Sequence, residues 1–452
     1  MTSTTPTTLA LMPEEQQLLL DRVKQMLALA EQQGASAAEV ASTINVGLEV
    51  TVRLGEVETV EFNREKSAGI TVYFGQRKGS AASSDLSDQA LAESVAAACA
   101  IAKYTGEDQC AGLADKNLLA FDYPELNLNH PWDIDAQQAI KLALACEDKA
   151  RAYDKRIDNS DGATVSTSQS YRVYGNSLGF LGECASTYHS LSCMLVASQN
   201  GAMQRDYYYT ATRNAQQLLT ADEVALHAAQ RTIQRLGARS LPTQAAPVIF
   251  EAPVARGLLG HFISAISGGN LYRKTSFLID HLGKRIFPDY ISLDEDPLLP
   301  SAIGSCPFDS DGVRTQPRAI VDEGILASYV LSTYSARKLG MQSTGNASGV
   351  HNLMVQTSDM DLPALINHMN RGLLVTELMG QGINIVTGDY SRGASGYWIE
   401  NGAIQFPVEG ITIAGNLRDM FANLVAVAND IDIRGNIRSG SILVEQMMIA
   451  GS

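Results

Sequence analysis

Apolar residues at helical spacing mark the first predicted element of the chain. Residues 13–33 (PEEQQLLLDRVKQMLALAEQQ) place them three or four positions apart, which indicates an amphipathic helix. Pro13 and the acidic pair Glu14 and Glu15 suit its first turn, and Gly34 supplies a stop. The predicted apolar face comprises Leu19, Val23, Met26, Leu27 and Ala30.

Strand patterns follow this helix and are closed by a second helix. Residues 45–63 and 69–85 alternate apolar and polar positions, and residues 88–105 return to helical spacing. This α+β unit is expected to end in the loop 106–117. Glycines within it predict turns, because glycine is the commonest residue at tight reversals. They are Gly55, Gly69, Gly75 and Gly79.

The same order repeats over the next hundred or so residues. A helix is predicted for 135–154, strands for 163–198 with a turn at Gly175-Asn176, and a helix for 221–239. The polar, proline-containing segment SLPTQAAP then predicts a domain boundary. The expected division is an N-terminal α+β domain, a middle α+β region packed with it, and a β-rich C-terminal domain: residues 1–125, 126–243 and 244–452.

Hairpin signals dominate the C-terminal region, which opens with a strand at 248–250 and a helix at 253–267. Asn401-Gly402, inside GYWIENGAIQFPVEG, is the strongest of them, since a type I′ turn needs positive φ at both central positions. Further helices are predicted near 361–372 and 416–424. The predicted fold class is therefore α+β, with two N-terminal α/β subunits before a larger, mainly antiparallel sheet or open barrel with helices.

Charge and composition narrow the range of partners. The 452 residues carry a net charge of -15, from 34 basic and 49 acidic side chains, and show no basic cluster. Nucleic acid is therefore not expected as a partner. No apolar run approaches the about 20 residues that a membrane span needs, and the N-terminal residues do not resemble a signal peptide. Six scattered cysteines without a CxxC pair indicate free thiols, so we expect a cytoplasmic protein that does not bind membranes.

The segment ARGLLGHFISAI (255–266) is the one stretch that invites a metal interpretation. A zinc peptidase helix of the HExxH type needs a second histidine four positions on and a glutamate directly after the first. Here Ala265 stands four positions after His261, Ile266 stands five after it, and Phe262 occupies the position of the base. Phenylalanine can neither ligate a metal nor accept a proton. The residues therefore predict a packed histidine rather than a ligand.

Several longer segments resemble the TldD/PmbA family of bacterial and archaeal proteins, also called the "modulator of DNA gyrase" family. The resemblance runs from about residue 40 to the end of the chain, and the chain is most similar to the PmbA branch, also called TldE. The segments are YRKTSFL (272–278), PFDSDGVRT (307–315), YSARKLG (334–340), TELMGQGINIVTGDYSRGASGYWIENG (376–402) and ITIAGNL (411–417).

The resemblance implies which metal-motif positions this chain has lost. The TldD branch carries HExxxH, and a cysteine near its C-terminus is the third zinc ligand. On this chain the first histidine corresponds to His261, the glutamate to Phe262 and the second histidine to Ile266. The cysteine region corresponds to RGNIRSGSI, where Ser439 stands and no cysteine occurs. We therefore expect no catalytic residue, no metal ligand and no cofactor in this chain.

The resemblance also implies a partner and a substrate class. PmbA-type chains pair with TldD-type chains in a heterodimeric zinc metalloprotease whose zinc belongs to the TldD subunit. Its substrates are unfolded or short peptides, among them peptide-antibiotic precursors and labile antitoxins. This chain is then expected to form part of the chamber wall. A homodimer is an alternative assembly for the isolated chain, because a surface that meets a homologue can also meet its own copy.

Two polar segments are candidates for contact with peptide. GDYSRGASG offers Asp389, Ser391 and Arg392 on a glycine-rich segment that suits added-strand binding of an extended peptide. RKTS places Arg273 and Lys274 after a Gly-Gly turn, where they could hold a peptide carboxylate. A structural strand and a solvated loop are equally compatible with these two patterns.

Two other functions stay open at this point. A self-sufficient metallopeptidase could draw on His261, His281 and His351, which share the C-terminal region. A binding adaptor could hold a peptide, toxin or antitoxin without cleaving it, and nothing in the sequence separates it from a subunit of a protease. A cysteine-protease nucleophile at Cys306 is disfavoured, because no histidine lies beside it in the sequence.

Overall fold

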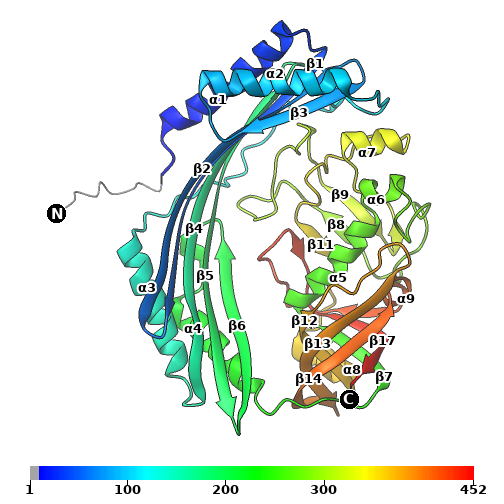
Figure 1. Cartoon of the computed structure of the whole chain (residues 1–452). Coiled ribbons are helices and arrows are strands. Elements are labelled where there is room, and N and C mark those ends of the chain that lie inside the picture. Colours follow the sequence, from blue (N-terminus) through cyan, green and yellow to red (C-terminus); the bar gives the residue numbers. More distant parts are fainter. Residues whose placement is uncertain (1–9, 452) are drawn as a thin grey trace, which may run out of the picture.

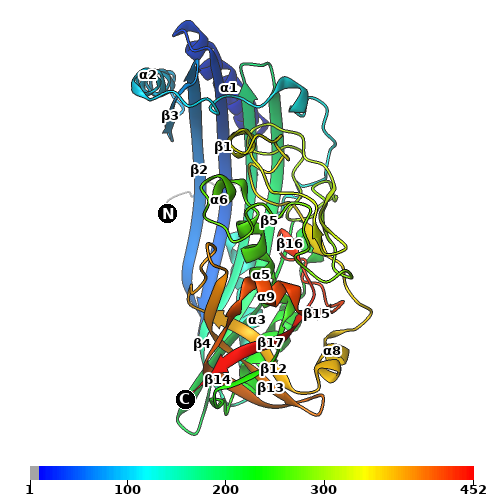
Figure 2. The same cartoon turned by 90° about the vertical axis from the view of Figure 1, so that its right-hand side faces the viewer.

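A computed structural model describes residues 10–451 and has two parts (Figure 1). One part is a long curved sheet with four helices, built from the first half of the chain. The other is a barrel with a second, smaller sheet and shorter helices, built from the rest. The view in Figure 2 shows the C-terminal part lying across one face of the long sheet. The predicted α+β class is confirmed.

The long sheet is shared by the first two predicted regions. Its central strand β1 pairs antiparallel with β2 on one side and with β4 on the other over nearly its whole length, so the two α+β units form one continuous six-stranded sheet. The division at residues 125 and 126 stays a prediction. In spatial order the strands are β3 (Arg77–Ser83), β2 (Glu56–Phe74), β1 (Ala37–Arg53), β4 (Ile157–Asn176), β5 (Leu181–Gln199) and β6 (Ala202–Thr212).

Four helices pack on this sheet through the apolar faces that the spacing predicts. Leu19, Val23, Met26 and Ala30 of α1 are buried, and Leu27 packs against the same cluster. Two helices cover one end of the sheet and two cover the other, each pair with its own apolar cluster. The pairs are α1 (Pro13–Gln32) with α2 (Asp88–Tyr104), and α3 (Ala136–Arg151) with α4 (Ala221–Gln234).

Two of the glycine-based turn predictions are wrong. Gly55 and Gly75 lie in turns, but Gly69 and Gly79 lie inside strands β2 and β3. Packing explains Gly79, because a Cβ there would stand 2.1 Å from the carbonyl oxygen of Ala98 in α2. This glycine lets the helix approach the strand, and it does not reverse the chain.

The predicted turn at Gly175-Asn176 is also misplaced. Both residues belong to β4, where Gly175 pairs with Val40 on one side and Leu181 on the other. The chain reverses over residues 177–180 instead. The Asn176 side chain causes the shift, because its Oδ1 accepts the backbone N–H groups of Leu178 and Phe180 and so closes the turn just after the strand.

The C-terminal sheet closes into a barrel. Its strand order is β14-β13-β12-β7-β17-β15, and a further pairing of β14 with β17 joins the ends of a five-stranded ring. The Asn401-Gly402 hairpin between β13 and β14 has the predicted positive φ at both residues, 54° and 71°. The strands are β7 (Gln244–Phe250), β12 (Gly372–Met379), β13 (Asp389–Glu400), β14 (Ala403–Asn416), β15 (Leu424–Val427) and β17 (Ile442–Ala450).

Helices fill and flank the barrel, and a five-stranded sheet lies beside it. Within residues 10–451, no helix is long and apolar enough to cross a membrane. The helices are α5 (Ala252–Ala265), α6 (Gly268–Tyr272), α7 (Thr333–Lys338), α8 (Leu362–Met369) and α9 (Leu417–Ala422). The small sheet contains β10 (Ile325–Leu326), β9 (Arg318–Asp322), β8 (Leu293–Glu295), β11 (Leu353–Val355) and β16 (Ile437–Arg438).

Candidate functional site

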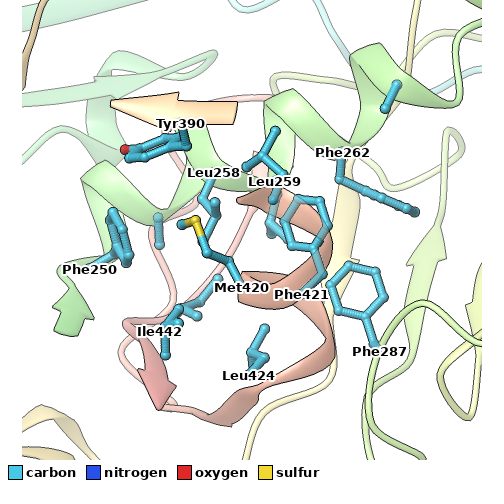
Figure 3. Close-up of a cluster of buried hydrophobic side chains, with 14 of the residues drawn as sticks. Phe250, Leu258, Leu259, Phe262, Phe287, Tyr390, Met420, Phe421, Leu424 and Ile442 are labelled. Carbon is cyan, nitrogen blue, oxygen red and sulfur yellow. The ribbon is translucent and has the colours of Figure 1, made fainter. Parts of the chain in front are cut away.

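Helix α5 and its C-cap residue Ile266 contain the positions that the sequence resemblance aligns with the zinc-binding helix, and two of them belong to the apolar core. The side chains of Phe262 and Ile266 are 0% exposed. The Phe262 ring meets Phe287 nearly edge-on at 5.1 Å between centroids and Phe421 at 5.7 Å (Figure 3). Such contacts stabilise a core beyond simple burial of area. The position of the base is therefore a packing position in this chain.

His261 lies on a different side of α5 and faces strand β13. Its ring meets the Tyr390 ring edge-on at 6.0 Å between centroids. Burial lowers the pKa of His261 below its ordinary value, and the positive charge of Arg392 acts in the same direction. Burial also raises the pKa of Tyr390. His261 is therefore a neutral imidazole at neutral pH, beside a phenol that keeps its proton.

Ser439, which the resemblance aligns with the cysteine region, is fully buried and forms an antiparallel bridge with Asp432. Its hydroxyl donates to the carbonyl oxygen of Gly440 at 2.8 Å, and its own carbonyl oxygen accepts the N–H of Asp432 at 3.0 Å. In the part of the chain that the structure describes, no three His, Cys, Asp or Glu side chains are grouped to hold a metal ion.

A cavity of about 340 Å³ lies beside α5, and we call it the tyrosine cavity. Strand β6 of the long sheet forms one wall with Tyr207, Tyr208 and Tyr209. The start of α5 and the adjacent ends of β12 and β13 form the opposite wall, which includes Glu377 and Arg392. Both parts of the molecule therefore contribute to this cavity.

Ion pairs hold the two walls of the tyrosine cavity together. The Arg434 guanidinium binds both carboxylate oxygens of Asp432, at 2.9 and 3.0 Å, and donates to the carbonyl oxygen of Tyr209 at 2.6 Å. It also lies 4.2 Å from the centre of the Tyr209 ring. Arg256 of α5 adds a hydrogen bond to the Tyr209 hydroxyl at 3.2 Å. Arg231 pairs with Glu251 at 2.9 Å.

Arg392 differs from these arginines because it has no counter-ion. Among residues 10–451 its side chain forms no ion pair or hydrogen bond, and its Nε is buried without a partner. The hydroxyl of Tyr390, two residues before it on β13, is likewise buried without a partner. A buried guanidinium nitrogen without an acceptor is costly, so this wall of the cavity is suited to an anionic group such as a carboxylate.

The predicted trio on β13 does not converge on one face. Side chains alternate along a strand, and Asp389 and Ser391 are exposed on the side opposite to Tyr390 and Arg392. Asp389 accepts a hydrogen bond from the Thr387 hydroxyl at 2.6 Å. Of the three residues, only Arg392 reaches the tyrosine cavity.

The second predicted pair lies away from this cavity. Arg273 and Lys274 are exposed just after α6, and neither lines the tyrosine cavity. Arg273 donates to the Tyr272 hydroxyl at 3.2 Å and to Oδ1 of Asn270 at 3.4 Å. Lys274 adopts a φ of 60° in the turn that follows the helix.

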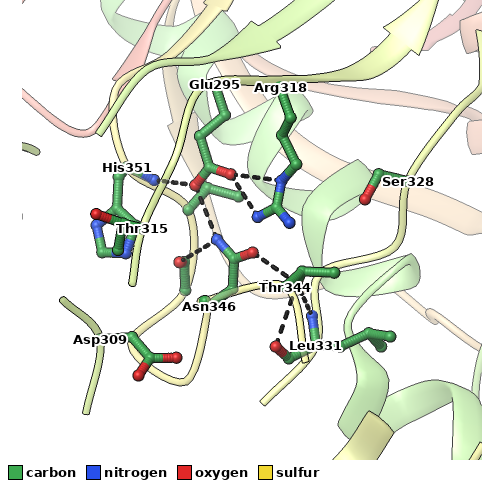
Figure 4. Close-up of polar contacts among 12 residues, drawn as sticks. Glu295, Asp309, Thr315, Arg318, Ser328, Leu331, Thr344, Asn346 and His351 are labelled. Carbon is green, nitrogen blue, oxygen red and sulfur yellow. Dashed lines mark hydrogen bonds and ion pairs between the residues drawn. The ribbon is translucent and has the colours of Figure 1, made fainter. Parts of the chain in front are cut away.

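Of the remaining histidines considered for a metal site, His351 joins a buried polar cluster (Figure 4). Its backbone N–H donates to Oε1 of Glu295 at 2.7 Å, and the side-chain amide of Asn346 donates to the same oxygen at 2.8 Å. Arg318 donates to the other oxygen at 2.6 and 3.0 Å. Both oxygens of Glu295 are engaged, which makes the cluster structural. Nδ1 of His281 lies 2.7 Å from the carbonyl oxygen of Ile279.

Cys306 is a half-buried thiol. Its Sγ lies 2.9 Å from the carbonyl oxygen of Phe308, and burial raises the pKa of the thiol above its ordinary value. A raised pKa opposes formation of the thiolate that a nucleophilic cysteine needs.

Sequence reasoning missed the residues that build most of the tyrosine cavity. The run of Tyr207, Tyr208 and Tyr209 is visible in the sequence as an unusual aromatic cluster on a strand. Arg434 pairs locally with Asp432, but its contact with Tyr209 has no local signal, because Tyr209 lies more than 200 residues away in β6.

Comparison with known proteins matches three consecutive parts of the chain to one family. They are the PmbA/TldA metallopeptidase domain 1 at residues 38–102, the central domain at 129–236 and the C-terminal domain at 243–451. The chain is 51% identical over 444 residues to the metalloprotease PmbA homolog of Haemophilus influenzae, covering 98% of each chain. It is 50% identical over 437 residues to metalloprotease PmbA of Escherichia coli O157:H7, covering 97% of each.

A solved structure has the same fold over the whole chain. The crystal structure of a putative modulator of DNA gyrase from Bacteroides thetaiotaomicron superposes with a TM-score of 0.91 at 27% identity. The match covers 98% of this chain and all of that one.

Proposed function

Because the chain belongs to the PmbA/TldD metallopeptidase family, we propose that it is the non-catalytic subunit of a heterodimeric zinc metallopeptidase. The zinc belongs to a homologous TldD-type partner, and this chain brings no metal or other cofactor of its own. The complex works in the cytoplasm on unfolded or short peptides, such as peptide-antibiotic precursors and antitoxins.

The packing of Phe262 is the observation that carries this proposal. A metallopeptidase needs a carboxylate base within reach of the zinc-bound water. At that position this chain has a fully buried ring between Phe287 and Phe421, and Ile266 is equally buried where the second histidine would stand. The core of the C-terminal part is therefore built on these apolar side chains. His261, the one remaining histidine of the motif, packs against Tyr390.

The tyrosine cavity supplies a role for a subunit without catalytic residues. It is lined by the exposed ring of Tyr207, by the half-buried rings of Tyr208 and Tyr209, and by the unpaired guanidinium of Arg392. Aromatic side chains bind peptide segments with little loss of conformational entropy, and arginine binds carboxylates through two parallel hydrogen bonds. In our proposal this wall holds the carboxylate end or an acidic side chain of a peptide while the partner cleaves it.

Two alternative functions would use other combinations of the residues described above. A binding adaptor would use the tyrosine cavity without any protease partner. A self-sufficient metallopeptidase would need His261, His281 and His351 to share one metal. The three histidines have different neighbours, which are Tyr390, the Ile279 carbonyl and the Glu295 cluster, respectively.

Reconstitution tests the proposal. The purified chain, a TldD-type chain from the same organism, and their mixture are assayed with a fluorogenic peptide library. We expect cleavage by the mixture and none by this chain alone. Cleavage by this chain alone would favour the self-sufficient enzyme. Peptide binding by this chain without any stimulation of the partner would favour the adaptor.

An Arg392 variant tests the role of the cavity. Arg392→Gln should raise the KM of the mixture for peptides with a free carboxylate by about tenfold, because a charge-assisted pair contributes about 1.5–3 kcal/mol. Arg77→Gln is the matched control, since it removes an exposed arginine that lies outside the cavity.

A further inference from the structure

A second cavity, of about 500 Å³, lies where the two parts of the molecule meet at one end of the long sheet. Its walls come from β1, β3, the end of α2 with the loop after it, and the start of α7. It shares no lining residue with the tyrosine cavity. We call it the acidic cavity, because Glu39, Asp108 and Asp311 line it together with a single cation, Lys78.

Two of these carboxylates are not neutralised by the protein. Asp108 is satisfied by Lys338 at 2.9 Å and by the Tyr334 hydroxyl at 2.7 Å. Glu39 and Asp311 form no ion pair within residues 10–451, and the negative charge of Asp311 lies close enough to Glu39 to contribute to its raised pKa. The cavity therefore has an excess of negative charge.

Glu39 is held in one orientation by two phenols. The Tyr73 hydroxyl donates to its Oε1 and the Tyr174 hydroxyl to its Oε2, both at 2.8 Å. The Tyr174 hydroxyl also lies 3.2 Å from the backbone carbonyl oxygen of Asp311, so Tyr174 links the Glu39 side chain to the Asp311 backbone. Burial raises the pKa of Glu39, while the two phenols lower it. Each carboxylate oxygen accepts one phenol and keeps a lone pair for a further donor.

Thr333 gives an independent indication that a ligand binds in the acidic cavity. Its side chain lines the cavity and is 5% exposed, and its Oγ1 has no hydrogen-bond partner in the described part of the chain. Its backbone N–H donates to Oδ2 of Asp311 at 2.9 Å, so Thr333 and this carboxylate are neighbours in the wall of the cavity. Buried hydroxyls almost always have a partner, so an unpartnered one that lines a cavity points to a group that binds there.

We propose that the acidic cavity binds a small organic ligand through a primary ammonium group. An ammonium has three donors and no acceptor, and Glu39, Asp311 and Thr333, which line this cavity, each carry a side-chain oxygen that can accept a hydrogen bond. The volume suits a ligand between an amino acid and a short peptide in size. Lys78, at the rim, can pair with a carboxylate at the other end of such a ligand.

Two kinds of ligand carry such an ammonium group: a short peptide, at its amino end, and a free amine. The proposal does not rest on the peptidase role, since neither the zinc-motif positions nor the tyrosine cavity line this space. Ligand occupancy would tie α7 of the C-terminal part to β1 of the long sheet and so stabilise the contact between the two parts.

Isothermal titration calorimetry of the full chain with three probes tests the proposal. Dialanine carries the ammonium and an amide, N-acetyl-dialanine lacks the ammonium, and putrescine is an amine without an amide. We expect binding of dialanine, of putrescine or of both, and none of N-acetyl-dialanine. Dialanine alone would identify a peptide end, and putrescine would identify a free amine. No binding of either amine up to about 10 mM, or equal binding of N-acetyl-dialanine, would overturn the proposal.

Two variants locate the binding in this cavity. Glu39→Gln should weaken the amine that binds by about tenfold or more, because the ammonium loses a charged acceptor. Glu49→Gln, which neutralises an exposed glutamate on the same strand, should leave its affinity unchanged. Equal affinity of Glu39→Gln and the unmodified chain would place the ligand elsewhere.

Thr333→Val provides a second variant with a stability readout. It removes the unpartnered hydroxyl while it keeps the side-chain shape, so the melting temperature without ligand should not fall. Affinity for the amine should decrease by about fivefold. A clear fall in the melting temperature without ligand would mean that the hydroxyl already has a partner in the protein, and that result would overturn its assignment to a ligand.

Discussion

Replacing Phe262 with the glutamate of the zinc motif tests whether this position belongs to the core. Phe262→Glu removes a ring that is 0% exposed and contacts Phe287 and Phe421. We expect a large loss of stability and no gain of peptidase activity, because the glutamate would lie among apolar side chains with neither a metal nor a second histidine beside it.

The magnitude follows from burial. Truncation of a buried phenylalanine costs about 3–5 kcal/mol, which already includes its lost ring contacts. A carboxyl group buried without a partner adds at least about 2 kcal/mol, even when it stays protonated. The sum exceeds about 5 kcal/mol, against a total stability of about 5–15 kcal/mol for a typical domain. The expected fall in melting temperature is therefore about 10 °C or more.

Phe262→Leu is the matched control in a thermal melt followed by circular dichroism and by limited proteolysis of the C-terminal part. It keeps the site apolar and should cost about 1–2 kcal/mol, or a few degrees. The packing argument is refuted if Phe262→Glu melts within a few degrees of Phe262→Leu. It is refuted more strongly if Phe262→Glu combined with Ile266→His folds normally and binds zinc.

Three further variants test the electrostatics and the packing. Arg318→Met should cost about 3–5 kcal/mol in urea unfolding, because it leaves the 1%-exposed Glu295 charged without a cation, whereas the exposed Arg205→Met should cost under about 0.5 kcal/mol. Burial, and then a neighbouring aspartate, raises the pKa of Asp309 to about 6. The folded state therefore binds the proton of Asp309 more tightly than the unfolded state does, so the stability that this group contributes is present below about pH 4 and is lost as the pH rises through 6. Relative to Asp309→Asn, wild type should therefore gain stability as pH falls from 7 to 4, and a pH-independent difference would contradict this. Gly79→Ala should lower the melting temperature by several degrees, since its Cβ would stand 2.1 Å from a backbone oxygen of α2, and an unchanged melt would show that the helix can move.

The sequence predicts those parts of the fold that are determined by residues close together along the chain. The buried face of α1 and the positive-φ hairpin at Asn401-Gly402 follow from helical spacing and from turn geometry. Gly79 and the turn after Asn176 were mispredicted because a neighbouring helix and a side-chain oxygen decide them. The closure of the barrel depends on the pairing of Thr412 with Ala450, which no local pattern contains.

The sequence alone predicts a feature of the candidate site only where the identity of a single residue determines that feature. The apolar character of Phe262 is plain in the sequence, and the structure adds that its ring packs in the core. Strand alternation alone would have separated Arg392 from Ser391. The contact between Arg434 and Tyr209 joins two distant segments through tertiary packing, so the tyrosine cavity could be found only in three dimensions.

Metal analysis of the purified chain tests the central claim most directly. The chain is incubated with excess zinc, freed of unbound metal by gel filtration, and measured by elemental mass spectrometry beside a TldD-type partner treated in the same way. The account predicts zinc in the partner and none retained by this chain. One tightly held zinc per molecule of this chain would contradict it and would make the self-sufficient metallopeptidase the better explanation.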